Sequence, residues 1–183
     1  MEQQKAKVGT TKDICYAALA VALICVCSWI AIPVGGVPIT LQSLAVFLTA
    51  VLLGVKRSIF AVIAYLVLGF VGVPVFAGFT GGFAKLLSPT GGYLLAFLFL
   101  TPCIALCFHK KTPSFWVLVL VFSVATLLLH LFGMLWLVFL AQNASVTGWW
   151  SAWAVCVLPC LLPDICKIFL GAFLSVKLHG KIR

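Results

Sequence analysis

The chain consists of long apolar runs that are separated only by short polar or glycine-rich breaks. Hydrophobic residues make up 64% of the 183 residues, charged residues make up 8%, and the mean hydropathy is +1.28. Soluble domains normally carry about 25% charged residues, so this chain has too few charges to cover a water-facing surface. Because roughly 20 apolar residues are needed to cross a bilayer, each run is a candidate membrane span. The composition therefore predicts an integral membrane protein.

Six such runs predict an all-α membrane protein with six transmembrane helices. They cover approximately residues 14–32, 40–54, 58–72, 92–108, 114–141 and 150–177. The second and third runs are short, so we expect them to be tilted little or to stop below the outer surface. We treat residues 1–183 as a single transmembrane domain with a polar N-terminal tail at 1–13.

The basic residues alternate with the apolar runs. The formal net charge is +9. Lys and Arg precede the first run, separate the second from the third and the fourth from the fifth, and follow the sixth, whereas the intervening segments carry only Lys85. The positive-inside rule then places both termini and the basic loops in the cytoplasm. The basic surplus is a topology signal, and no aromatic–basic platform accompanies it that would indicate nucleic-acid binding.

One acidic and one basic residue lie inside the last apolar run. Asp164 and Lys167 are one helical turn apart, whereas the other acidic residues, Glu2 and Asp13, belong to the polar tail. A carboxylate within a membrane-length apolar helix costs about 2.5–3.5 kcal/mol on insertion scales, so such residues usually mark a pathway or a ligand site. The spacing puts both side chains on one helix face, where each offsets the other's charge. We expect this pair to recognise a small polar group.

Two prolines precede the charged pair. Pro159 and Pro163 each lack a backbone N–H, so we expect the last span to kink or open just before Asp164. Freed backbone groups within a bilayer are tolerated only where protein or a cavity satisfies them. A broken helix beside a charged pair is the arrangement that transporters use for binding sites inside the membrane.

The glycine-rich outer segment at 73–91, between the third and fourth spans, differs from the other connections. Gly81 and Gly82 allow positive φ angles and close backbone approach to a ligand, and Phe76 and Phe79 offer flat apolar surface. A connection of this length without obvious structure usually has a function, such as covering a site. An interfacial loop with aromatic belt residues has the same composition, so both interpretations stand.

Few other polar residues lie in apolar surroundings. His130, near the middle of the fifth run, either relays a proton or satisfies a local hydrogen bond. Gln42 and Thr40 are candidate ligand contacts because they lie near the outer end of the second run. The chain has no Walker motif, no hydrolase or zinc-protease motif and no dense carboxylate set. We therefore expect no enzyme activity, no metal and no cofactor, and any active transport must draw its energy from partner proteins or from an ion.

Four segments carry a family resemblance: P-I-T-L-Q at 38–42, L-G-F-V-G-V-P-V-F-A-G at 68–78, L-L-S-P-T-G-G-Y at 86–93 and P-C-L-L-P-D-I-C-K at 159–167. With them the chain resembles the BioY family, the biotin-specific substrate-binding (S) subunits of energy-coupling factor (ECF) transporters, from about residue 12 to residue 177. The resemblance implies a six-helix protein of the cytoplasmic membrane that captures biotin at its outer side. It also implies that biotin is the transported ligand and that ATP is used only by partner subunits.

The resemblance also implies roles for individual residues. Asp164 and Lys167 match an Asp and a Lys that contact the ureido ring, and Phe76, Phe79 and Tyr93 would cover the thiophane ring and the alkyl chain. The other expected ligand contacts are Gly78, Gly82, Gln42 and Lys85. Lys85 is expected either to attract the biotin carboxylate or merely to meet lipid headgroups. The chain departs from the family where Leu-Pro-Asp replaces a frequent Pro-Gly-Asp, where Gly78 replaces an Asn of some members, and where Ser88 replaces a common Gly.

The expected protein partners are the ECF ATPase subunits and a transmembrane coupling subunit. Ala18 and Ala22 have the small-xxx-small spacing that lets helices approach closely in lipid. Packing within the six-helix bundle would use the same residues, but the family docks a small-residue face of the first helix onto the coupling subunit.

Two rival functions remain open. A membrane enzyme would use Asp164 as acid or base, with Lys167 as the obvious second group. A self-sufficient ion- or proton-coupled carrier would use Asp164, Lys167 and His130 as a relay.

Overall fold

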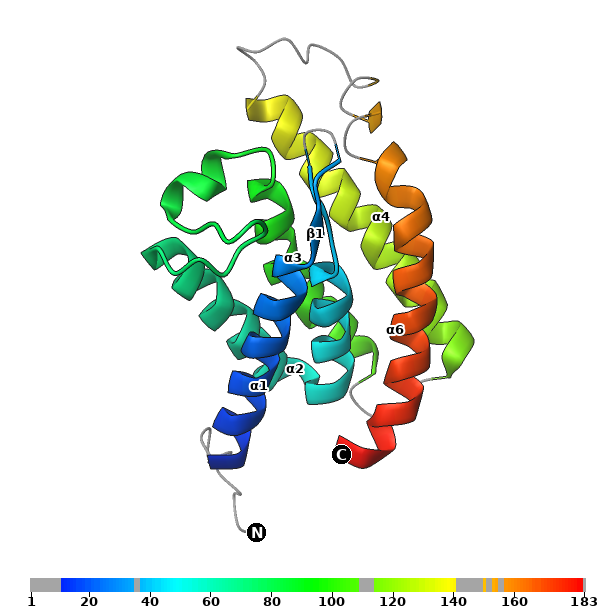
Figure 1. Ribbon diagram of the computed structural model, residues 1–183. Helices are drawn as coiled ribbons and strands as arrows, with labels where there is room; N and C mark the ends of the chain where they lie inside the picture. Colours follow the sequence, from blue (N-terminus) through cyan, green and yellow to red (C-terminus); the bar gives the residue numbers. More distant parts are fainter. Residues whose placement is uncertain are drawn as a thin grey trace.

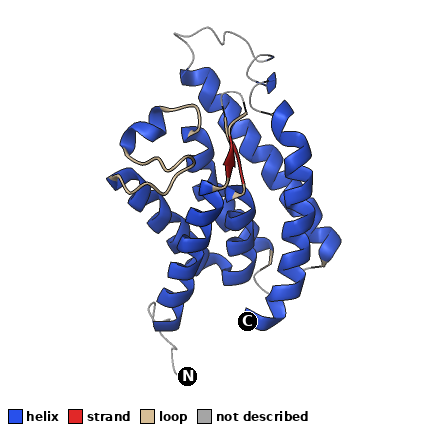
Figure 2. Ribbon diagram, viewed as in Figure 1, coloured by secondary structure: helices blue, strands red, loops and turns tan. Residues whose placement is uncertain are grey.

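The computed structural model describes residues 11–34, 37–108, 114–140, 150, 153–154 and 157–182. The described part consists of helices with one small β-ribbon among them (Figures 1 and 2). The α-helices are α1 (Thr11–Trp29), α2 (Gln42–Val71), α3 (Gly91–Cys107), α4 (Phe115–Leu140) and α6 (Leu161–Ile182). Two 3-10 helices, η1 (Phe83–Leu87) and η3 (Leu158–Cys160), and two strands, β1 (Ala31–Ile32) and β2 (Ile39–Thr40), complete the described elements.

Four described helices are long and apolar enough to cross a membrane, and α3 is a shorter apolar helix. The prediction of an all-helical, multi-pass membrane protein is confirmed at this level. The second and third expected spans are assigned as one element, α2, which is interrupted at Gly54 with φ 74° and ψ 178°. Glycine adopts this conformation without a steric penalty. Figure 1 shows the two halves of α2 running down and back up from this point.

The end of the bundle at Gly54 carries Arg57, which pairs with an acidic residue of α1. Arg57 Nη2 lies 2.5 Å from Asp13 Oδ1, and its guanidinium lies 5.7 Å from the ring centroid of Tyr16. Asp13 lies in the first turn of α1. This helix begins at Thr11, within the polar tail that the sequence analysis places at residues 1–13. Helix α1 begins and α6 ends at this same end of the bundle (Figure 1).

Helix α2 is the centre of the packing. It contacts α1, α3 and α6, and α4 packs against α3 and α6. Ile24, Val46, Leu118 and Phe122 are almost completely buried in the resulting core. Large apolar side chains on the outer faces, such as Trp116 of α4, are exposed, as expected where the surroundings are lipid.

Two connecting segments at the opposite end differ in detail from expectation. The turn-rich connection after α1 contains the antiparallel pair β1–β2, with Ala31 opposite Thr40, which the sequence did not predict because each strand has only two residues. The glycine-rich outer segment is partly ordered by η1 and by the bridge between Phe76 and Thr80. It is also tied to α1, because Trp29 Nε1 donates to Pro74 O at 2.9 Å.

At the position of the expected kink in the last span, the 3-10 helix η3 ends and α6 begins. Pro159 lies in η3, and Pro163 lies in the first turn of α6, where backbone N–H groups have no partner within the helix. Asp164 is therefore in the first turn of α6 rather than in the middle of a longer helix. Most of the expected span before residue 157 lies outside the described residues.

Candidate binding site

A cavity of about 620 Å³, including its open mouth, lies between β2, the start of α2, the outer segment, α3, α4 and the start of α6. The P-I-T-L-Q segment, the residues around Phe76, Tyr93 and the residues around Asp164 all contribute to its lining. Segments far apart in the sequence thus converge on one space.

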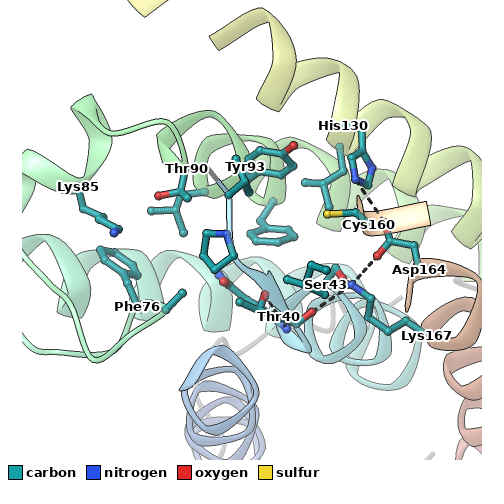
Figure 3. A pocket seen from close by; sticks show the side chains of 18 residues that line it. Thr40, Ser43, Phe76, Lys85, Thr90, Tyr93, His130, Cys160, Asp164 and Lys167 are labelled. Atoms are coloured by element: carbon teal, nitrogen blue, oxygen red, sulfur yellow. Dashed lines mark hydrogen bonds and ion pairs between the residues drawn. The ribbon is translucent and has the colours of Figure 1, made fainter. Parts of the chain in front are cut away.

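The charged pair lies at one end of this cavity. Asp164 is 7% exposed, and its Oδ1 pairs with Lys167 Nζ one turn further along α6. Lys167 Nζ also donates to Thr40 O at 3.1 Å and to Ser43 Oγ at 3.5 Å (Figure 3). The first-turn position favours the carboxylate, because the N-terminus of a helix carries partial positive charge.

His130 of α4 faces the same carboxylate. Its Nε2 lies 3.3 Å from Asp164 Oδ2 (Figure 3). Its Nδ1 lies 2.9 Å from the backbone oxygen of Thr126, one turn earlier in α4. The ring also meets the ring of Tyr93 edge-on, with centroids 5.9 Å apart. From the sequence, His130 was expected either to relay a proton or to satisfy a local hydrogen bond. In the structure it makes a local hydrogen bond and also lies beside Asp164.

Two buried polar atoms at this end of the cavity form no hydrogen bond. Asp164 Oδ2 lies near His130 without good hydrogen-bond geometry, and the Gln42 amide nitrogen Nε2 has no acceptor although Gln42 is 5% exposed. Buried polar atoms in native proteins are nearly always paired, so unpaired ones in a cavity call for an explanation. A ligand that donates a hydrogen to Asp164 and accepts one from Gln42 would satisfy both atoms.

Aromatic side chains form the apolar part of the wall. Phe76 is 1% exposed and packs edge-on against Tyr65, with ring centroids 5.5 Å apart. A Cβ atom on Gly69 would overlap the Phe76 ring, and a Cβ atom on Gly133 would overlap the ring of Tyr93. These two glycines therefore let the rings sit directly on the neighbouring helices.

Lys85 of η1 lines the cavity together with Thr90. Figure 3 shows Lys85 on the opposite side of the cavity from Asp164 and Lys167. The cavity thus offers a cation at one end, a buried ion pair at the other, and aromatic rings between them.

Some residues expected at the site do not line the cavity. Of the nine expected ligand contacts, six line it: Asp164, Lys167, Tyr93, Phe76, Gln42 and Lys85. The remaining three, Gly78, Phe79 and Gly82, have positive φ angles in the outer segment and lie outside the lining. Phe79 is 65% exposed and stacks on Trp29 instead, with ring centroids 5.1 Å apart.

The two alanines expected at a partner surface are exposed. Ala18 and Ala22 lie on the outer face of α1. The buried face of the same helix uses Ala17 and Ala20, which pack against Ala61 of α2. Packing within the described bundle therefore does not use Ala18 and Ala22.

Four polar or sulfur-containing residues of the lining were not among the site residues expected from the sequence: His130, Ser43, Thr90 and Cys160. Ser43 directly follows P-I-T-L-Q, Thr90 lies within L-L-S-P-T-G-G-Y, and Cys160 lies within P-C-L-L-P-D-I-C-K, so the motifs themselves carried a signal for three of them. Within the described residues, no group of three or more His, Cys, Asp or Glu is arranged to hold a metal ion.

The chain is similar to biotin transport proteins. The sequence profile of the BioY family matches residues 1–183. The biotin transporter BioY2 of Lactococcus lactis subsp. cremoris is 41% identical over 165 residues, which cover 88% of this chain and 86% of the relative. The biotin transporter BioY of Thermotoga maritima is 38% identical over 163 residues, with coverage of 88% and 92%.

A solved structure has the same fold. The S-component for biotin from an ECF-type ABC transporter superposes with a TM-score of 0.81 and 29% sequence identity. The match covers 93% of this chain and 92% of that chain. The likeness therefore extends over most of both chains.

Proposed function

Because the chain belongs to the BioY family, we propose that it captures biotin and takes it across the cytoplasmic membrane as the S component of an ECF-type transporter. The observation that carries this proposal is the buried Asp164–Lys167 pair at one end of a cavity lined by polar and aromatic side chains. A buried ion pair is costly to form, so its presence in a cavity indicates a function in binding.

The ureido ring of biotin matches the polar end of the cavity. The ring presents two N–H donors and one carbonyl acceptor. Asp164 Oδ2 is an acceptor with no hydrogen bond of its own, and Gln42 Nε2 is a donor without an acceptor. Lys167 Nζ can turn to the ligand carbonyl by giving up Ser43 Oγ, its longest contact at 3.5 Å. Charge-assisted bonds of this kind are roughly twice as strong as neutral ones.

The rest of biotin fits the rest of the lining. Phe76 and Tyr93 provide apolar surface for the thiophane ring and the alkyl chain. Lys85, across the cavity from the ion pair, then meets the carboxylate of the ligand (Figure 3). This placement favours a carboxylate contact for Lys85 over a contact with lipid headgroups.

The topology follows from the same proposal. Counting the halves of α2 on either side of Gly54 as two spans gives the six that the sequence predicts. The end with Arg57 and the C-terminal end of α6 then lie in the cytoplasm, and the cavity opens toward the outer side.

The partners are the ECF ATPase subunits and a transmembrane coupling subunit. Ala18 and Ala22 are exposed on α1, and small residues allow the close helix contact that association in lipid requires. We assign this face of α1 to the coupling subunit. ATP is consumed by the ATPase subunits, and this chain contributes the biotin site.

Equilibrium binding of labelled biotin to the purified chain in detergent tests the proposal. We expect saturable binding that excess biotin displaces and that dethiobiotin and lipoate displace less well, because each lacks part of the ring system. Absence of saturable binding by the folded chain would refute the function.

Reconstituted uptake separates the proposal from the rival carrier. With the ATPase and coupling subunits present, we expect ATP to increase biotin uptake into vesicles. Uptake by this chain alone that collapses with an uncoupler would instead identify a self-sufficient ion-coupled carrier.

A further inference from the structure

The side chain of Thr90 lies in the wall of the cavity and does not cap the helix that follows it. Thr90 immediately precedes α3, which begins at Gly91, and a threonine in this position commonly accepts a hydrogen bond from a backbone N–H of the first turn. Thr90 makes no such bond, and it lines the cavity instead. Helix capping therefore does not account for a hydroxyl group at this position.

Two contacts of Ser88 fix the direction in which the Thr90 hydroxyl donates. Ser88 Oγ donates to the backbone oxygen of Lys85 at 2.6 Å, and it lies 2.9 Å from Thr90 Oγ1. A hydroxyl group has a single hydrogen, and a carbonyl oxygen can only accept, so the hydrogen of Ser88 is used at Lys85. Thr90 is therefore the donor in its contact with Ser88.

Lys85 is the cation on the same side of the cavity as Thr90, away from the Asp164–Lys167 pair (Figure 3). Asp164 and Lys167 pair with each other, whereas Lys85 forms no ion pair with any described residue. A lysine ammonium is a point charge on a flexible stem, whereas the β-branched side chain of a threonine is restricted at χ1. Lys85 can therefore supply charge, and Thr90 can supply a donor at a defined position.

We propose that Thr90 is a specificity-determining residue whose hydroxyl donates a hydrogen bond to the carboxylate of biotin, beside the ammonium of Lys85. This inference rests on the proposed function, which places the ureido ring at Asp164 and the alkyl chain along the aromatic rings. On binding, the O–H bond of Thr90 rotates from Ser88 to the carboxylate, and no other atom has to move. Ser88 keeps its bond to Lys85 O, and its half-buried side chain keeps access to water.

This exchange of acceptors selects for an ionised carboxylate. A hydrogen bond to a charged acceptor is roughly twice as strong as one to a neutral acceptor, so moving the bond from Ser88 to a carboxylate oxygen gains free energy. Moving it to the oxygen of an amide or an ester gains little, because each of these acceptors is neutral. The substrate class is therefore the free acid, and biotin that is joined to another molecule through an amide bond is expected to bind more weakly.

The test compares the dissociation constants of biotin and biotinamide for the purified chain. Biotinamide keeps the ring system and the alkyl chain, and its amide oxygen is a neutral acceptor. In Thr90→Val a methyl group replaces the hydroxyl group with little change in shape. We expect this variant to bind biotin about five- to tenfold more weakly than the wild-type chain, which is the excess of a charged over a neutral hydrogen bond. Binding of biotinamide should stay within about twofold of wild type, because a neutral bond is exchanged for another neutral bond.

Three further variants separate the hydroxyl group from the shape of the side chain. Thr90→Ser keeps the hydroxyl group and is expected to keep the wild-type ratio of the two dissociation constants. Thr90→Ala removes the hydroxyl group without adding a methyl group, and we expect the same selective loss for biotin. The matched control is Thr80→Val in the same outer segment, because Thr80 does not line the cavity and its Oγ1 donates to Ala77 O at 2.9 Å. This control is expected to bind both ligands as the wild-type chain does.

Combining Thr90→Val with Lys85→Ala tests whether the two side chains meet the same carboxylate. The double variant is expected to bind biotin and biotinamide with nearly equal affinity, because both contacts to the carboxylate are then lost. A double variant that prefers biotin as strongly as Lys85→Ala alone would show that Thr90 does not contact the carboxylate.

The outcomes distinguish this inference from the proposed function. If Thr90→Val and Thr90→Ala weaken both ligands by the same factor, or weaken neither, the hydroxyl group does not read the carboxylate and the inference is overturned, while biotin capture stands. A wild-type chain that binds biotinamide as tightly as biotin has the same meaning. If the folded wild-type chain does not bind biotin, both proposals fail.

Discussion

Replacing Asp164 by Asn removes the negative charge with little change in side-chain shape, so it tests directly whether this carboxylate binds the ureido ring. Asn has nearly the same shape, and its amide oxygen is expected to turn toward Lys167, because the amide nitrogen would face an ammonium with donor against donor. The NH₂ group then takes the position of Oδ2, the buried atom that forms no hydrogen bond. In that position it faces the N–H of the ureido ring, again donor against donor.

The cost of the substitution for binding can be worked out from these contacts. Losing one charge-assisted hydrogen bond costs about 1.5–3 kcal/mol, and leaving the ligand N–H unpaired costs about 1–3 kcal/mol more. The sum of about 2.5–6 kcal/mol corresponds to a dissociation constant that is roughly 10²- to 10⁴-fold larger. The loss of stability should stay below the roughly 3–5 kcal/mol of a fully broken buried pair, since Thr40 O, Ser43 and the amide oxygen still accept from Lys167.

Equilibrium binding of labelled biotin in detergent measures the first quantity, and thermal unfolding of the same samples measures the second. Asp13→Asn is the matched control, because it makes the same chemical change in a half-exposed pair with Arg57 at the other end of the bundle. An exposed pair contributes at most about 1 kcal/mol, so this control should bind biotin normally. If Asp164→Asn is folded and binds biotin with unchanged affinity, the assignment of the ureido ring to Asp164 is wrong.

Three further changes test other parts of the site. Gly133→Ala should displace the Tyr93 ring and weaken biotin binding at least tenfold. The control Gly171→Ala crowds a helix contact outside the cavity, so it should lower the melting temperature while the folded fraction binds biotin normally. Equal biotin affinities of the two variants would show that the position of the Tyr93 ring does not matter for binding. Lys85→Ala should weaken biotin more than biotinamide, by roughly 1 kcal/mol or about fivefold for a partly exposed charge pair, and equal losses for both ligands would show that Lys85 does not meet the carboxylate. Ala18→Trp should leave biotin binding by the isolated chain unchanged and abolish ATP-driven uptake by the complete transporter, and loss of both would mean that this alanine stabilises the bundle.

The amino-acid sequence determined the membrane character of this protein and the identity of its charged pair. Apolar runs separated by basic loops leave few alternatives to membrane-spanning helices, because each run must keep its backbone hydrogen bonds within itself. The i, i+3 spacing of Asp164 and Lys167 brings them together on any helix, so their pairing follows from local geometry alone. Gly54 lies between two apolar runs, beside basic residues, and the break in α2 occurs there.

Tertiary structure alone decided what surrounds that pair. Lys167 contacts Ser43 and Thr40, which precede it by 124 and 127 residues in the sequence. Asp164 lies beside His130, which belongs to another helix. No periodicity links such distant positions, because their contact depends on how the whole bundle packs. The same packing turns Phe79 outward onto Trp29, although Phe79 is the same residue type as the buried Phe76 and lies in the same outer segment. The sequence thus specifies which groups can form a site, and the packing of α2, α4 and α6 specifies which of them meet.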